Sequence, residues 1–141
     1  MPTIGAGVAD TAFATIDPQA VDGTNGNDSM MVGFRDGDGN MIDGADGMSE
    51  AIYGYGGNDK IFSGAGDDFV YGGSGNDFVR AGDGNDLIQG GDGNDVLDGG
   101  IDEDSMVGGA GNDTLIGGQG ADSMAGGNDR DVFLVTVQGH G

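Results

Sequence analysis

The sequence contains no cysteine and no tryptophan, and it has only one histidine and two prolines. Without cysteine, the chain can form neither disulfides nor thiolate metal sites. The one histidine, His140, is next to the last residue, so we expect no zinc site. Because a thiol nucleophile and an internal histidine base are both lacking, we expect no catalytic residues and no enzyme activity in this chain.

Basic residues and long apolar runs are also scarce. The chain has four lysines and arginines in total but 25 aspartates and glutamates, which gives a formal net charge of −21. This charge argues against nucleic acid and anionic membranes as partners. No segment approaches the roughly 20 apolar residues of a membrane span, and residues 1–10 show no secretory signal. So acidic a chain repels itself unless cations bind to it.

Glycine and aspartate are abundant instead, and both recur at a fixed period. The 34 glycines follow no collagen repeat. From residue 59 onward, an aspartate returns every nine residues and is followed two residues later by an apolar side chain. A strict short period predicts a stack of similar units rather than a conventional globular core. The aspartates are Asp59, Asp68, Asp77, Asp86, Asp95, Asp104, Asp113, Asp122 and Asp131, and the apolar residues are Ile61, Val70, Val79, Ile88, Leu97, Met106, Leu115, Met124 and Phe133.

The period divides the chain into four parts. Residues 54–134 form a regular array of nonapeptides G-G-x-G-x-D-x-U-x, where U is a large apolar residue. Residues 23–53 are irregular repeats with an inserted loop, and Glu50 and Ile52 stand at the aspartate and apolar positions of the last one. Residues 1–22 are expected to cap one end of the stack. Residues 135–141 are expected to be a truncated edge, the chain being a piece of a longer protein.

Each nonapeptide predicts one turn and one strand. The half G-G-x-G-x-D should turn, because glycine permits positive φ, and the half x-U-x should form a short strand. Two turns and two strands take eighteen residues and bring the chain back above its start. Strands eighteen apart should therefore form two parallel sheets with the U residues between them, an all-β fold. The aspartates should line two edges, which we call the Asp59 edge (Asp59, Asp77, Asp95, Asp113, Asp131) and the Asp68 edge (Asp68, Asp86, Asp104, Asp122).

Stacked carboxylates and turn carbonyls predict a series of calcium sites. Calcium takes about six to eight hard oxygen ligands, whereas magnesium demands a tight octahedron and softer metals prefer nitrogen or sulfur. We expect about four gaps between aspartates on one edge and about three on the other, hence about seven or more Ca²⁺ ions. The candidate ligands are Asp28, Gly57, Asp59, Gly66, Asp68, Gly75, Asp77, Gly84, Asp86, Gly93, Asp95, Asp104, Gly111, Asp113, Gly120, Asp122 and Asp131.

The nonapeptides resemble those of the RTX (repeats-in-toxin) family, most closely in Gly72–Arg80 (GGSGNDFVR) and Gly90–Asp98 (GGDGNDVLD). The resemblance implies a calcium-filled parallel β-roll, a right-handed β-solenoid of haemolysin-type nonapeptide repeats. It also implies type I secretion from a bacterial cell, an extracellular or cell-surface location, and folding on meeting outside calcium. Asp102 and Asp129 depart from the pattern, because each replaces a glycine. We expect a distorted stack or a more weakly held ion at those levels.

Several alternatives remain open from the residues. Residues 36–40 (DGDGN) resemble the start of an EF-hand loop, but the rest of that loop fails. The Asp17–Pro18 bond resembles the cleavage site of the calcium-triggered self-cleavage module that some RTX-like proteins carry, so the resemblance also implies self-cleavage as an alternative. Apolar residues beside U, such as Phe69, Phe78 and Leu87, predict either ordinary strand composition or a surface for self-association or contact with a longer parent chain. The chain could also be an adhesive or ice-binding solenoid, or the non-catalytic repeat part of a larger secreted enzyme.

Overall fold

All regular structure that the computed structural model describes, in residues 21–31 and 48–135, is β-strand. The two strands before the gap in these ranges are β1 (Val21–Asp22) and β2 (Ser29–Met30). After it come β3 (Ala51–Tyr53), β4 (Lys60–Ala65), β5 (Phe69–Ser74), β6 (Phe78–Asp83), β7 (Leu87–Asp92), β8 (Val96–Ile101), β9 (Ser105–Ala110), β10 (Thr114–Gln119), β11 (Ser123–Asn128) and β12 (Val132–Leu134).

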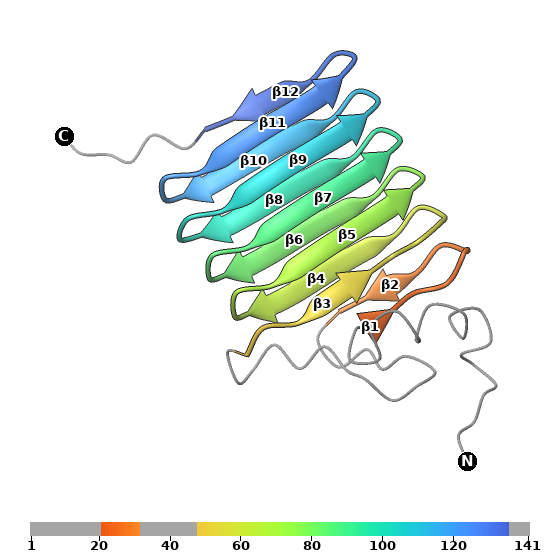
Figure 1. The fold of residues 1–141 in the computed structure, drawn as a ribbon, viewed down its shortest axis with the longest axis horizontal. Coiled ribbons are helices and arrows are strands. Elements are labelled where there is room, and N and C mark those ends of the chain that lie inside the picture. Colours follow the sequence, from red (N-terminus) through yellow and green to blue (C-terminus); the bar gives the residue numbers. More distant parts are fainter. Residues whose placement is uncertain (1–20, 32–47, 136–141) are drawn as a thin grey trace.

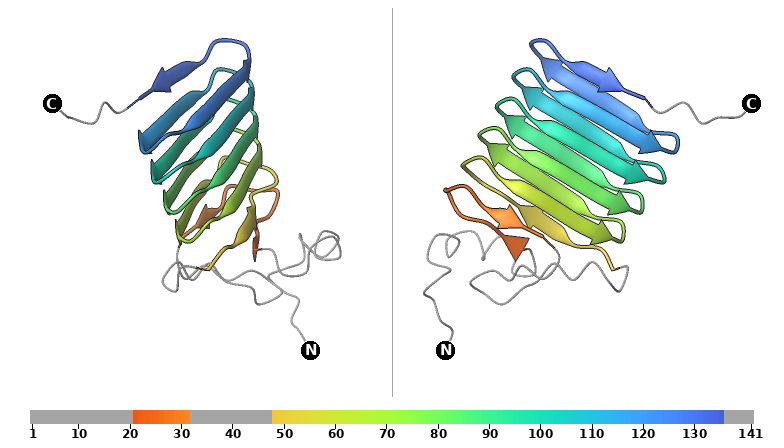
Figure 2. Two further views of the ribbon diagram at one scale, coloured as in Figure 1. Left: turned by 60° about the vertical axis from the view of Figure 1, so that its left-hand side comes forward. Right: turned by 180° about the vertical axis from the view of Figure 1, so that it is seen from behind.

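The strands form two parallel sheets that the chain enters alternately. One sheet has the order β1-β3-β5-β7-β9-β11 and the other β12-β10-β8-β6-β4-β2. In the regular array, partners are eighteen residues apart, as in Val79 with Leu97 and Leu97 with Leu115. The chain therefore winds as a β-solenoid, with strands stacked like rungs and turns along both edges (Figures 1 and 2). The expected parallel β-roll is confirmed.

The core is a single stack of U side chains between the two sheets, as predicted. Met124 packs against this stack and is partly buried, but Phe133 is 46% exposed. The expectation that Phe133 is a core residue is therefore wrong, because β12 belongs to the last coil of the described residues and none of these residues forms a coil that covers it. The buried U residues are Met30, Ile52, Ile61, Val70, Val79, Ile88, Leu97, Met106 and Leu115, and two further residues, Val21 and Ala81, are buried in the same core.

The strands are longer than predicted and the turns shorter. Each strand from β4 to β11 has six residues, so the pair Gly99-Gly100 lies inside β8 rather than in a turn. Gly100 pairs in register with Gly82 and Gly118 in the neighbouring strands. Gly100 has a φ of 111°, which would be strained for a residue with a side chain. Because glycine adopts this conformation without strain, the pairing of β8 with its neighbouring strands continues through it. Glycines that indicated a turn therefore extend the sheet.

Asp102 and Asp129 stand where other coils have glycine, and like those glycines they have positive φ. Their φ values are 83° and 77°, and aspartate tolerates this left-handed region better than most residues. The ladder continues past Asp102, since the amide of Ser123 donates to the Asp104 carbonyl at 2.8 Å. A local distortion remains beside Asp102, because the Gly84 amide lies 3.3 Å from the Ile101 carbonyl oxygen, whereas the equivalent Gly66–Asp83 and Gly75–Asp92 hydrogen bonds are 2.9 Å long. Weaker ion binding at these levels stays a prediction.

Some of the expectations concern residues outside the described ranges. They are the cap over residues 1–20, the inserted loop with its EF-like segment at 36–40, the Asp17–Pro18 bond and most of the edge at 135–141. Within residues 21–31 and 48–135, no helix is long and apolar enough to cross a membrane.

Candidate metal centre

The repeat aspartates form two files, one along each edge of the solenoid. On the Asp59 edge, the backbone amide of each aspartate donates to Oδ1 of the aspartate one coil later. These hydrogen bonds join Asp59 to Asp77 (2.9 Å), Asp77 to Asp95 (2.8 Å), Asp95 to Asp113 (2.8 Å) and Asp113 to Asp131 (3.0 Å). On the Asp68 edge they join Asp68 to Asp86 (2.8 Å), Asp86 to Asp104 (2.9 Å) and Asp104 to Asp122 (3.0 Å). The structure thus brings together the two sets that the spacing predicts.

Both files are buried along most of their length. Seven aspartates, from Asp59 to Asp113, are at most 2% exposed, whereas Asp122 and Asp131 in the last coils are half-buried. In all seven, the second carboxylate oxygen, Oδ2, is buried and has no hydrogen-bond partner. A buried anionic oxygen without a donor is costly, so each file needs a positive partner.

A backbone carbonyl lies beside several of these oxygens. We call the residue five positions before each repeat aspartate the contact residue. A Cβ added at the contact residue Gly72 would lie 2.6 Å from Asp77 Oδ2 and 2.8 Å from the carbonyl oxygen of Gly90, one coil later. Gly54 meets Asp59 Oδ2 and the Gly72 carbonyl in the same way, at 2.6 and 2.5 Å. Two hard oxygens thus converge next to a glycine backbone.

The sequence reasoning missed these carbonyls. It assigned ligand roles to the glycine two residues before each aspartate, not to the contact residue. A signal was present, because the contact residue is glycine throughout the Asp59 edge, at Gly54, Gly72, Gly90, Gly108 and Gly126.

The glycines that were assigned ligand roles lie in the turns. They pack closely along the stack: a Cβ on Gly75 would collide with the Gly57 carbonyl oxygen, one on Gly84 with that of Gly66, and one on Gly93 with that of Gly75. Their carbonyls therefore face the next coil, and their role as metal ligands stays a prediction. All have positive φ: Gly57, Gly66, Gly75, Gly84, Gly93, Gly111 and Gly120.

Asp28 heads the Asp59 edge but differs from the other aspartates. Its amide donates to Asp59 Oδ1 at 2.8 Å, which places it in the same file. Its own Oδ2 accepts the Thr24 amide at 2.7 Å, and the Thr24 hydroxyl lies 3.0 Å from the same oxygen. The protein itself satisfies this carboxylate, so the case for a metal is weaker here than at Asp59. Calcium at Asp28 stays a prediction.

The interior raises the pKa of the buried carboxyls. Burial raises the pKa of Asp59, Asp86 and Asp95 to about 7, and that of Asp104 to about 6. The backbone hydrogen bond to each carboxylate lowers its pKa in part, and neighbouring carboxylates raise it further. Burial also raises the pKa of Asp77 and Asp113. Without a cation, these files resist ionisation near neutral pH.

The donor set fits calcium better than other common metals. Among the described residues, no three histidine, cysteine, aspartate or glutamate side chains gather into a metal cluster. The carboxylates stand in a file, one per coil, so a bound ion would need backbone carbonyls to complete its shell. Calcium accepts carbonyl and carboxylate oxygens together in variable geometry, whereas zinc would need nitrogen or sulfur.

A second ladder runs along the outside of the Asp59 edge, formed by the asparagine that precedes most repeat aspartates. The amides of Asn76, Asn94 and Asn112 each donate to the side-chain oxygen of the asparagine one coil earlier, at 2.8 Å. On the other edge, the Asn85 amide donates to Asp67 Oδ1 at 2.9 Å. This ladder was not predicted, although the recurring Gly-Asn-Asp triplet was its signal.

A parallel β-solenoid with two internal files of buried carboxylates is the architecture of a calcium-binding repeat protein. A family model of the RTX calcium-binding nonapeptide repeat, which describes four copies, matches residues 44–79, 71–106 and 99–133. These matches cover more than half of the chain, and the chain belongs to this family. No curated protein and no solved structure gives a significant match.

Proposed function

We propose that this chain is the calcium-triggered folding module of a secreted bacterial protein, which stays open at low calcium and folds outside the cell. The observation that carries the proposal is the row of seven buried Oδ2 atoms without a donor. Family membership supports calcium as the ion and secretion as the setting. Folding and binding are then one event, because the site does not exist in the unfolded chain.

The energetics favour an unfolded chain without metal. Raising the pKa of one carboxyl from 3.8 to about 7 costs about 4 kcal/mol of folding stability once the group is ionised. Asp59, Asp86 and Asp95 share this shift, so three such costs reach about 12 kcal/mol, comparable with the 5–15 kcal/mol that holds a typical domain folded. Bound cations would remove this cost.

The proposed ions lie between successive aspartates of each file. The amide–carboxylate ladder defines four such gaps on the Asp59 edge and three on the Asp68 edge. Each gap offers Oδ2 atoms and turn carbonyls as ligands. Together they would hold about seven ions, in the weak range of about 10⁻⁴–10⁻³ M that is typical of extracellular calcium modules.

The outer faces favour a structural module over an adhesive or ice-binding surface. The outward row that crosses β6, β8 and β10 reads Phe78, Val96 and Thr114, so no threonine rank forms. The aromatic side chains there are already engaged: Arg80 lies 5.8 Å from the Phe62 ring centroid and 5.9 Å from that of Phe78. We therefore place the activity of any longer protein outside these repeats.

Circular dichroism and metal analysis test the proposal. In chelator we expect a coil spectrum, with a strand spectrum on adding calcium but not on adding equal magnesium. Metal analysis of the folded protein should give about five or more calcium ions per chain. A chain that is fully folded in chelator, or that magnesium folds equally well, would overturn the proposal.

A further inference from the structure

The two edges of the solenoid differ at the contact residue. On the Asp59 edge it is always glycine. On the Asp68 edge the first two are Ser63 and Ala81, which precede Asp68 and Asp86, and glycine returns only at Gly99 and Gly117. Ser63 and Ala81 are eighteen residues apart, so two successive coils carry a side chain at this position on the same edge.

A side chain at the contact residue meets the carboxylate. A Cβ on Gly99 would lie 2.4 Å from Asp104 Oδ2, and one on Gly117 would lie 2.5 Å from Asp122 Oδ2. Real Cβ atoms essentially never come closer than 3.0 Å to such atoms, so carboxylate or backbone must shift to admit one. Ser63 and Ala81 are fully buried. Their side chains therefore take up interior space that the glycine coils leave to the carboxylate.

The serine hydroxyl also engages a carbonyl. Ser63 Oγ donates to the carbonyl oxygen of Ala81, one coil later, at 3.0 Å. On the Asp59 edge the equivalent oxygens, those of Gly90 and Gly108, lie beside the contact residue and the unpartnered Oδ2. The Ser63 hydroxyl therefore binds a carbonyl whose counterparts on the Asp59 edge have no side chain of a contact residue beside them.

We infer that Ser63 and Ala81 weaken the calcium sites at the start of the Asp68 edge, so that this chain has two classes of site. This inference rests on the proposed function. The four gaps of the Asp59 edge and the Asp104–Asp122 gap have glycine at every contact residue and form the tighter class. The Asp68–Asp86 and Asp86–Asp104 gaps form the weaker class and fill last.

The test exchanges contact residues between the two edges. Calcium binding is measured by equilibrium dialysis with metal analysis, and by calorimetry, on the wild type, on Ser63→Gly/Ala81→Gly, and on the mirror variant Gly72→Ser/Gly90→Ala. The glycine variant should bind its last ions on the order of tenfold more tightly, the scale of an altered surrounding shell. The mirror variant should move ions from the tighter class to the weaker one.

The loss of chain entropy on folding would weaken calcium binding in the glycine variant, so tighter binding would point to relief of the contact with the carboxylate. Replacing serine or alanine by glycine destabilises a strand by roughly 0.5–1 kcal/mol, so a purely structural role would weaken calcium-coupled folding rather than tighten binding. Ser63→Ala isolates the hydroxyl and should give part of the gain. A glycine-variant isotherm that overlays the wild type or lies to weaker binding would overturn the inference and leave the proposed function intact. A wild type that binds no calcium would instead overturn both.

Discussion

Removing the carboxylate of Asp95 should raise the calcium concentration needed for folding. Asp95 is 1% exposed and lies in the middle of the Asp59 edge, with a neighbour on each side of its file. Its Oδ2 is unpartnered, and its Oδ1 accepts the Asp77 amide at 2.8 Å. Asp95→Ala therefore removes a proposed anionic ligand from two gaps and leaves the buried Asp77 amide without its acceptor.

The size of the effect follows from linkage. Removing one partner of a buried charge pair costs about 3–5 kcal/mol. Because about seven ions bind together with folding, that loss is shared among them and shifts the midpoint by only about two- to threefold. Asp95→Asn keeps the Oδ1 acceptor and should be milder than alanine by the roughly 1–3 kcal/mol of an unsatisfied buried amide.

Asp28→Ala is the matched comparison, since Asp28 belongs to the same file but takes its partners from Thr24. Its loss removes ordinary hydrogen bonds, each worth about 0.5–1.5 kcal/mol, and should shift the midpoint by less than about 1.5-fold for one such bond. Calcium titrations followed by circular dichroism measure all three variants. If Asp28→Ala raised the midpoint more than Asp95→Ala, the buried file would not be the cooperative unit.

Three further predictions address acid, packing and the last coil. In chelator, lowering the pH from 7.5 to 5.5 should increase the strand signal in circular dichroism. Because the pKa values of the buried aspartates are raised in the folded form, that form keeps protons that the unfolded chain releases. The loss of folding stability from ionising these carboxyls is therefore absent below about pH 4 and grows as the pH rises toward about 7. A strand signal that fell on acidification would contradict this reasoning. Gly90→Ala should impair calcium-induced folding because its Cβ would collide with the Asp95 carboxylate, whereas Gly56→Ala should be tolerated because the nearest atoms lie 3.5 Å from its Cβ, an ordinary contact distance. Equal effects of the two substitutions in circular dichroism would refute the packing argument. In saturating calcium, the amides of Val132–Leu134 should exchange faster than those of Val96–Asp98, because the former side chains are about half exposed and form an edge strand; equal protection in a monomer would show that the edge is closed.

The nine-residue period predicts most of this fold because each repeat forms the same turn and strand. Eighteen residues per coil places Asp77 beside Asp95 and Leu97 beside Leu115 without knowledge of any distant contact. The period alone was therefore enough to predict the two sheets, both files of carboxylates and the core from Ile61 to Leu115, but not the exposure of Phe133.

The period does not predict where the strand begins and ends within each repeat, or which backbone groups of neighbouring coils meet. The pair Gly99-Gly100 indicates a turn by composition, but parallel pairing with the neighbouring coils draws it into β8. The asparagine ladder and the contact-residue carbonyls arise only when coils are stacked, so a single repeat does not reveal them. The partnering of Asp28 by Thr24 depends on an irregular turn outside the regular array.

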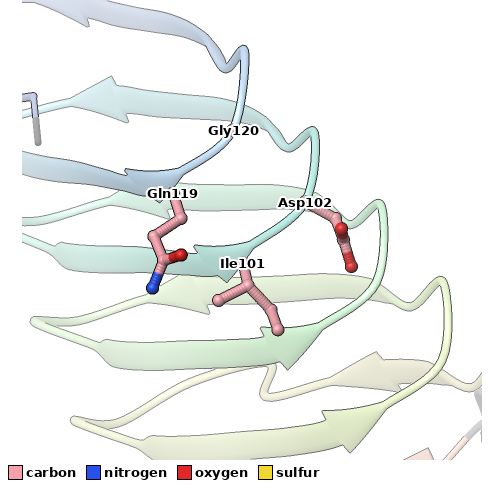
Figure 3. Close-up of a pocket in the computed structure, with 4 residues that line it drawn as sticks. All are labelled: Ile101, Asp102, Gln119 and Gly120. Atoms are coloured by element: carbon pink, nitrogen blue, oxygen red, sulfur yellow. The ribbon is translucent and has the colours of Figure 1, made fainter. Parts of the chain in front are cut away.

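The two ends of the described solenoid differ in how their aspartates are buried and hydrogen-bonded. At the Asp28 end, Thr24 supplies donors to the carboxylate, so the file ends without need of an ion. At the other end, Asp122 and Asp131 are half-buried, and Phe133 and Leu134 are exposed. Before this end, a pocket is lined by Ile101 and Gln119, the last residues of β8 and β10, and by Asp102 and Gly120 in the turns that follow (Figure 3). An ion near Asp131 would keep water among its ligands and order the chain less than one near Asp77. We therefore expect order to decline along the described stack from β3 toward β12, which hydrogen exchange of the strand amides in saturating calcium would show.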